Sequence, residues 1–213
     1  MRTVLHVGCG VNTLSSLPPL FQDGTWDEIR YDIDDKVQPD IVGELQDLSI
    51  IEDGSIDALY SSHNIEHVWA FEVPPVLKEF RRVLKPDGFA MVLCPDVQSV
   101  AQAIAEGYLD KPLYVSPAGP ITALDILYGF HSAIEKGNLF MAHKTAFTTE
   151  TLASHLLRAG FAGIAVARDK AFGLHAAAFL AGFDAKEANA LASQVHPAQK
   201  FLLEVNRYGD LAS

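Results

Sequence analysis

The chain has 213 residues, 49% of them hydrophobic, and a formal net charge of −11 from 16 basic and 27 acidic residues. This length and composition suit one α/β domain with a sizeable core and exclude wholesale disorder. The negative charge disfavours nucleic acid as a partner, because like charges repel. The main basic run falls on a predicted helix and is interpreted as a solvated face: Lys78, Arg81, Arg82 and Lys85.

The beginning of the chain passes directly into an apolar segment, without the charged, apolar and small-residue succession of a secretory signal. The longest apolar stretch, residues 174–183, has about half the length needed to cross a bilayer. Two cysteines, Cys9 and Cys94, are too few for a disulfide framework or a cysteine zinc site. We therefore expect a cytoplasmic protein with no membrane partner.

Short apolar segments separated by turn signals predict four strands in the first third of the chain. They cover residues 2–7, 27–33, 40–45 and 55–62. Pro18 and Pro19 cut short any helix after the first strand. Residues 34–39 leave too little room for a helical crossover, which needs roughly a dozen residues. One sheet face is therefore expected to be thinly covered, unless the insertion described below or a second chain packs there.

A helix and a fifth strand follow. Apolar residues keep helical spacing within residues 72–84, and the Lys-Pro-Asp-Gly sequence at 85–88 ends that helix and turns the chain. Residues 89–94 form a continuous apolar run, as expected for a parallel strand buried on both faces. This alternation predicts a Rossmann-like, doubly wound α/β sheet of about seven strands, mostly parallel with the last strand antiparallel.

In the second half of the chain the alternation of strands and helices is interrupted and then resumes. Residues 96–147 are punctuated by proline and glycine and rich in aromatic residues, which indicates an irregular helical insertion after strand five that could act as a lid. A helix at 149–159, ended by Gly160, and strands at 163–167 and 174–180 are then expected. Residues 185–213 are predicted to form a C-terminal helix and tail, so that residues 1–213 make a single domain.

A glycine turn and an acidic residue point to a nucleotide-like ligand. Gly8 and Gly10 follow the first strand, where glycine lets the backbone turn tightly and approach a ligand. Asp32 ends the next strand, and an acid about 20 residues after such a turn typically binds ribose hydroxyls. Asp34 and Asp35 are its rivals, and Asp32 could instead serve only as a turn residue at the strand end.

Several segments together resemble class I S-adenosylmethionine-dependent methyltransferases, in particular those called methyltransferase type 11. These segments are "VLHVGCG", "IRYDID", "DIVGELQDL", "SIDALYSSHNIEHV", "LKEFRRVLKPDGFAMVLCPD" and "FTTETLASHLLRAGF". They occur in the family's order and spacing over about residues 3–95 and 147–181. The resemblance implies S-adenosylmethionine as the cofactor and methyl transfer to an oxygen or nitrogen atom of a small-molecule acceptor.

The resemblance also implies roles for individual residues. Asp32 would bind the ribose hydroxyls, and Glu44 would accept from the adenine amino group, with Asp47 as a second candidate. The segment at the end of the fourth strand would lie where cofactor and acceptor meet. The implied cofactor-binding residues are Gly8, Cys9, Gly10, Asp32, Glu44, Leu45, Ser62 and His63.

Two positions depart from the family pattern. His6 stands where relatives usually have an acid, and Asn12 replaces the third glycine, although asparagine can still adopt a left-handed conformation. These departures keep a non-catalytic Rossmann-like binding module open as an alternative. A dinucleotide-dependent oxidoreductase is a second alternative, disfavoured because the third glycine and a nicotinamide-side motif are missing.

The sequence Ser-Ser-His-Asn-Ile-Glu-His at 61–67 has the His-x-x-Glu-His spacing of some zinc peptidases. A zinc site would need His63 and His67 on one helical face and a third ligand. The segment follows a strand directly, so we expect no metal here. His63 is a candidate base for the acceptor, whereas Glu66 and His67 could instead cap or orient the next helix.

The insertion is expected to hold the acceptor. Its polar groups that could converge are Tyr128, His131, His143 and Lys144, and His143 is the preferred acceptor contact. The expected partners are a small-molecule acceptor and a second copy of the chain in a homodimer.

Overall fold

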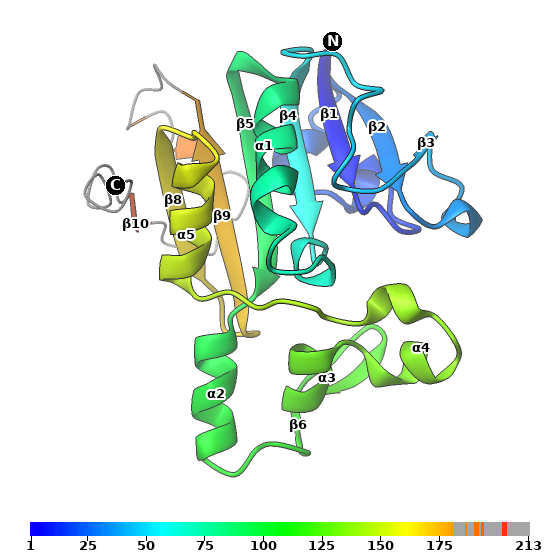
Figure 1. Cartoon of the computed structure of the whole chain (residues 1–213), viewed down its shortest axis with the longest axis vertical. Helices are drawn as coiled ribbons and strands as arrows, with labels where there is room; N and C mark the ends of the chain where they lie inside the picture. Colours follow the sequence, from blue (N-terminus) through cyan, green and yellow to red (C-terminus); the bar gives the residue numbers. More distant parts are fainter. Residues whose placement is uncertain (181–185, 187–189, 192, 194–201, 204–213) are drawn as a thin grey trace.

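The computed structural model describes residues 1–180, 186, 190–191, 193 and 202–203. Its centre is an eight-stranded sheet with the order β10-β8-β9-β5-β4-β1-β2-β3 (Figure 1). Strands β1 to β5 are parallel, and β9 runs antiparallel between β5 and β8. The Rossmann-like sheet with an antiparallel last strand is thus confirmed, and the short β10, which pairs with β8, adds an eighth strand to the predicted seven.

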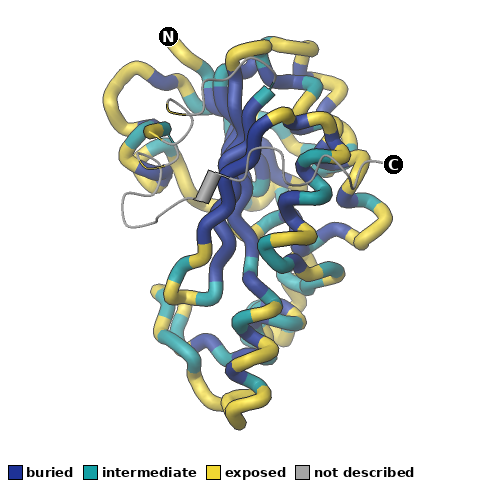
Figure 2. Tube along the Cα trace, turned by 90° about the vertical axis from the view of Figure 1, so that its left-hand side faces the viewer, coloured by how far each residue is buried: buried dark blue, intermediate teal, exposed yellow. Residues whose placement is uncertain are grey.

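The parallel strands lie close to their predicted positions. They are β1 (Arg2–Val7), β2 (Trp26–Asp32), β3 (Ile41–Val42), β4 (Ile56–Ser62) and β5 (Leu84–Pro95). Residues 85–88, where a turn was predicted, lie inside β5. The strand is irregular there, since its pairing with β4 shifts between Ile56 and Ala58. The closing pair, β8 (Gly163–Arg168) and β9 (Gly173–Phe179), is buried along almost its whole length, and Figure 2 shows the buried strands running through the molecule.

Two helices cover one face of this sheet. They are α1 (Val73–Val83) and α5 (Thr149–Arg158), and both lie in front of the strands in Figure 1. Their apolar sides, which include Phe80 and Leu156, are fully buried in the main core. A capping box between Thr148 and Thr151 begins α5 by satisfying backbone N–H groups that have no partner within the helix.

The other face is covered differently near β1 and β2. Two 3-10 turns, Leu14–Ser16 and Pro19–Gln22, occupy the place of a first helix, as the two prolines predict. Phe21 and Trp26 pack there as a second apolar cluster with Tyr60 and Phe89. A third 3-10 turn, Asp35–Val37, joins β2 to β3 in place of a crossover helix, again as predicted.

The insertion lies beyond the carboxyl ends of the strands and not over the thin face (Figure 1). It contains α2 (Val97–Ala105), α3 (Ala123–Tyr128) and α4 (His131–Glu135). Besides these helices, the predicted irregular helical insertion contains a hairpin that the sequence did not indicate, formed by β6 (Pro112–Ser116) and β7 (Gly119–Thr122). The predicted C-terminal helix and tail, residues 185–213, lie mostly outside the described residues.

No helix in the described part of the chain is both long enough and apolar enough to cross a bilayer.

Candidate active site

The turn after β1 has the geometry that its glycines predict. Gly8 and Gly10 adopt left-handed backbone angles, with φ of 63° and 53°. A Cβ atom on Gly8 would lie 2.2 Å from Nδ2 of Asn64, so a larger residue there would require the Asn64 side chain or the turn to shift. The Gly8 N–H donates to the carbonyl of Tyr31 at 2.8 Å. The turn is thus packed tightly between β2 and the segment that follows β4.

Asp32 connects this turn to the end of β2. Its Oδ2 accepts a hydrogen bond from the Gly10 N–H at 2.7 Å, and its Oδ1 accepts one from the Asp34 N–H at 2.9 Å. The residue is only 9% exposed. Each carboxylate oxygen keeps accepting capacity for a further donor, so Asp32 serves the turn and can also contact a ligand.

Arg30 fixes the loops around the turn, although no sequence pattern had marked it. Its guanidinium donates to the carbonyl oxygens of Gly10 at 2.7 Å and Asn12 at 3.0 Å. It also donates to the carbonyls of Val37 at 3.1 Å and Gln38 at 2.6 Å. One planar side chain therefore holds together two loops that have no crossover helix behind them.

His6 lies on the opposite face of the sheet from this turn, beside Tyr60. Its Nδ1 is 2.7 Å from Oε1 of Glu28, and the other Glu28 oxygen accepts from the Leu14 N–H at 2.6 Å. Both side chains of this pair are more than nine-tenths buried. The departure at His6 therefore supports the short turn that replaces the first helix.

A cavity of about 380 Å³ opens where these loops meet, and we call it the larger cavity. Its volume falls in the range of roughly 300–1,000 Å³ that is usual for small-molecule sites. It lies at the carboxyl ends of the strands, where open α/β sheets bind ligands. Of the predicted site residues, its wall includes Gly8, Gly10, Asp32, Glu44, Leu45 and His63.

Three other candidates lie outside this wall. Cys9 is fully buried, and burial is the main cause that raises the pKa of its thiol to about 11. Ser62 is half-buried and does not line the cavity. Asp47 accepts from the Ser49 N–H at 3.0 Å and faces away from the cavity wall, which contains Gln46 instead.

The lining of the larger cavity is predominantly acidic. Four of its lining residues carry a carboxylate and one, Lys144, an ammonium group, so its field attracts positive charge. Asn64 also lines it, and its Nδ2 is buried with no hydrogen-bond partner in the described part of the chain. Such an unsatisfied donor is expected to pair with a bound ligand. The four acidic residues are Asp32, Asp34, Glu44 and Glu72.

A second cavity of about 140 Å³, the smaller cavity, lies between the sheet end and the insertion. His63 and His67 line both cavities and therefore stand at their junction. Glu66, Asp125 and His143 also line it. The remaining lining residues come from distant segments and are mostly apolar: Pro95, Tyr114, Ile121, Ile126, Phe130, Met141, Ala171 and Phe172.

His63 has an unusual backbone conformation for a residue with a side chain. Its φ is 50°, in the left-handed region, and its side chain is 62% exposed. Strain of this kind is often found at functional sites. Its Nδ1 lies 3.4 Å from Oε1 of the buried Glu66, and this contact raises the pKa of the His63 imidazole although burial opposes the shift.

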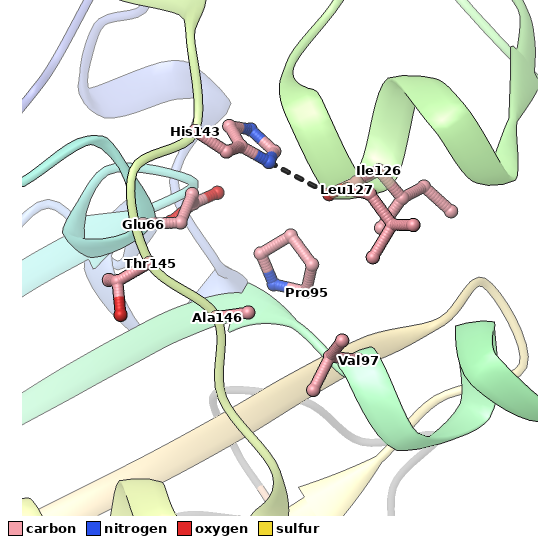
Figure 3. Close-up of a pocket in the computed structure, with 8 residues that line it drawn as sticks. All are labelled: Glu66, Pro95, Val97, Ile126, Leu127, His143, Thr145 and Ala146. Atoms are coloured by element: carbon pink, nitrogen blue, oxygen red, sulfur yellow. Dashed lines mark hydrogen bonds between the residues drawn. The ribbon is translucent and has the colours of Figure 1, made fainter. Parts of the chain in front are cut away.

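His67 and His143 meet on the other side of Glu66. Their rings lie edge to face with centroids 4.8 Å apart. Nδ1 of His67 is 3.1 Å from the carbonyl oxygen of Ala142, and Nδ1 of His143 is 2.8 Å from that of Ile126, a hydrogen bond drawn in Figure 3. Burial lowers the pKa of His143, which favours its neutral form.

The remaining polar groups predicted for the insertion do not converge. Tyr128 is 61% exposed, and His131 points to Asp125, with its Nδ1 3.0 Å from the carboxylate. Lys144 lines the larger cavity and lies over the ring of Trp69. Only His143 of this group reaches the smaller cavity.

The chain was compared with known proteins. Residues 5–92 match the family model described as "Methyltransferase domain". Among curated proteins no match was found.

Solved structures share the fold at low sequence identity. A protein from Pyrococcus horikoshii OT3 superposes with a TM-score of 0.59 and 19% identity, covering 84% of this chain and 82% of that one. A structure described as SAM-dependent methyltransferases, from Methanosarcina mazei, gives a TM-score of 0.54 and 16% identity, covering 84% and 92%. A SAM-dependent methyltransferase from Thermotoga maritima gives 0.51 and 15%, covering 83% and 81%.

Residues 5–92 therefore match a methyltransferase domain. The strand order of the sheet belongs to a fold that solved S-adenosylmethionine-dependent methyltransferases share.

Proposed function

We propose that this protein is a class I S-adenosylmethionine-dependent methyltransferase that acts on an oxygen or nitrogen atom of a small molecule held in the smaller cavity. The observation that carries the proposal is that His63 and His67 line both cavities, so that a molecule in one can meet a molecule in the other. Bound S-adenosylmethionine supplies an electrophilic methyl group. Transfer of that group depends chiefly on the alignment of the two reactants and the exclusion of water.

In this proposal the larger cavity binds the cofactor. Asp32 binds the ribose hydroxyls, Glu44 and Leu45 bind the adenine ring, and Gly8 and Gly10 leave their backbone open to the methionine part. The Asn64 amide is added to this set because its Nδ2 is buried and unpaired within the described residues. Cys9 contributes only its backbone, and Ser62 supports His63 from the end of β4.

The smaller cavity accounts for the acceptor class. Its volume of about 140 Å³ is below the usual range for drug-sized ligands. Its wall combines aromatic and aliphatic side chains with histidines and the carboxylates of Glu66 and Asp125. An acceptor with a flat apolar body and one nucleophilic oxygen or nitrogen fits such a mixed wall. His63 takes the proton of that atom, because it stands at the junction of the cavities, and His143 contacts the acceptor from the insertion.

Calorimetric titration with S-adenosylhomocysteine tests the cofactor part of the proposal. Asp32→Ala is expected to weaken binding by at least about tenfold, since it removes a charge-assisted hydrogen-bond acceptor. Asp47→Asn, a nearby acid outside the cavity wall, is the matched control and should bind as the wild type does. Equal affinity of Asp32→Ala and the wild type would show that the ribose contact lies elsewhere.

The acceptor part is tested with a library of small aromatic alcohols and amines and a cofactor that carries an isotope-labelled methyl group. The labelled methyl is expected in at least one product, detected by mass spectrometry. His63→Gln should lower kcat and leave the affinity for S-adenosylhomocysteine near the wild-type value. Methyl transfer only to macromolecules, or an unchanged kcat, would contradict the proposal.

A further inference from the structure

The buried carboxylate of Glu66 has an ionic contact with His63 but accepts no hydrogen bond within the described residues. The residue is only 1% exposed. Its nearest polar neighbour is Nδ1 of His63, 3.4 Å from Oε1. Burying a carboxylate costs several kcal/mol unless it is paired or coordinates a metal. Glu66 is therefore a buried charge beside the smaller cavity that would be stabilised by a bound cation.

His67 and His143, which lie beside Glu66, are oriented as metal-binding histidines typically are. Nδ1 of His67 hydrogen-bonds to the backbone carbonyl of Ala142, and Nδ1 of His143 to that of Ile126. A carbonyl can only accept, so both Nδ1 atoms carry the proton and both Nε2 atoms keep a free lone pair. Metal-binding histidines are typically oriented by such a hydrogen bond from the second ring nitrogen.

Together these residues form a cluster of one carboxylate and two imidazoles. Their ligand atoms all lie within 4.8 Å of one another. Ligands of a tetrahedral zinc ion lie about 3.3 Å apart, a separation that follows from bond lengths of about 2.0–2.1 Å. Small side-chain rotations would close the difference. We propose that Glu66, His67 and His143 bind one divalent transition-metal ion, of which Zn²⁺ is the natural probe.

This site differs from the zinc pattern considered in the sequence. That pattern pairs His63 with His67 on one helix, whereas the segment forms only a short 3-10 turn, Ile65–His67, and His63 is largely exposed. The second imidazole comes from His143, in the insertion. The backbone N–H of Lys144 donates to the carbonyl of Glu66 at 2.8 Å, which holds the two segments together.

The position of the cluster gives the ion two roles. It joins the insertion to the end of β4, so a bound ion would stabilise the insertion against unfolding. With three protein ligands it keeps an open position, as catalytic zinc sites do, and all three ligands line the smaller cavity. The use of that open position to bind the oxygen or nitrogen atom of the acceptor rests on the proposed function, whereas metal binding itself does not.

The test uses the full-length, tag-free chain after dialysis against a chelator. Titration calorimetry with Zn²⁺ is expected to show one saturable site, and Co²⁺ should give the visible absorption of a low-symmetry site. Glu66→Gln and His143→Ala are expected to bind Zn²⁺ at least about 100-fold more weakly. His131→Ala, which removes an exposed histidine of the same insertion, should bind Zn²⁺ as the wild type does.

Thermal unfolding and cofactor binding separate the metal site from other effects. Zn²⁺ should raise the melting temperature of the wild type and leave that of Glu66→Gln unchanged, because the variant lacks the carboxylate ligand. S-adenosylhomocysteine is titrated in parallel, so that failure of the proposed function is recognised separately. Absence of saturable binding in the wild type, or wild-type affinity in a folded His143→Ala or Glu66→Gln variant, would overturn the proposal.

Discussion

The two cavities of this protein are built in opposite ways. The wall of the larger cavity comes mostly from residues 8–72, whose strands follow one another in the sequence and lie close together in the sheet. The smaller cavity combines the end of β4 and β5 with the β6–β7 hairpin, α3 and the turn before β9. The first is a product of local strand ends, and the second depends on contacts between segments far apart in the chain.

This difference separates what is general from what is specific. Strand ends, a glycine turn and an acid form the larger cavity, within the part of the chain that matches the methyltransferase domain. The smaller cavity depends on how one insertion folds back, and we propose that it selects the acceptor. Substitutions can be chosen that alter either the larger cavity or the insertion alone.

Gly8→Ala is expected to have the largest effect. The new Cβ would lie 2.2 Å from Asn64 Nδ2, and alanine would be held at a φ of 63°. The turn or the Asn64 side chain, which both line the larger cavity, must then move. The affinity for S-adenosylhomocysteine should fall by at least about 100-fold, which corresponds to about 3 kcal/mol. Titration calorimetry on the folded variant measures this loss.

Gly24→Ala is the matched control for the backbone strain. Gly24 also has a positive φ, of 80°, but a Cβ there would meet nothing within 4 Å. It should lose about 1 kcal/mol of stability and keep wild-type affinity. If Gly8→Ala binds as well as Gly24→Ala, the turn does not form the cofactor site.

The sequence was sufficient for the sheet and most of the larger cavity. The strands, α1 and α5 were found because their apolar periodicities are local properties of the chain. Gly8 and Asp32 were found because a turn and an acid at a known spacing carry a physical meaning. Arg30 was missed because it binds four backbone carbonyls, and every residue has a backbone carbonyl, so no residue type marks these contacts in the sequence.

The smaller cavity was largely beyond the sequence. The β6–β7 hairpin was missed because its strands are short, contain prolines and are only partly buried, so they lack a clear alternation. The grouping of Glu66, His67 and His143 joins two segments that only the folded insertion brings together. Asn64 lay in a motif that drew attention to its histidines, and its role depends on contact with Gly8.

Asp125 tests the stability of the insertion alone. Burial by itself raises the pKa of its carboxyl, but hydrogen bonds from Thr122 and His131 outweigh burial and lower that pKa from 3.8 to about 2. The ionised form is therefore bound more favourably in the folded state, which contributes about 2 kcal/mol above the unfolded pKa of 3.8. That contribution is lost as the pH falls from about 4 through 2.

Urea unfolding of the wild type and Asp125→Asn over a series of pH values measures this contribution. The variant should be less stable by about 2 kcal/mol at pH 6, and the difference should shrink below pH 4. Asp110→Asn, an exposed acid of the same insertion, should change stability by less than about 0.5 kcal/mol. A difference that does not depend on pH would mean that the Asp125 interactions do not require its charge.

Arg30→Met, which affects the larger cavity, is expected to cause the smallest loss of free energy among these variants, the controls aside. It keeps most of the side-chain volume but removes the donors that hold the loops at Gly10 and Val37, both of which line the cavity. These loops remain attached to β1 and β2, so the affinity for S-adenosylhomocysteine should fall only about tenfold, or about 1.4 kcal/mol. Arg158→Met, an exposed change at the end of α5, is the control for loss of charge. If Arg30→Met and Arg158→Met bind S-adenosylhomocysteine equally well, the glycine turn is rigid without Arg30. The larger cavity would then depend on the strand ends alone.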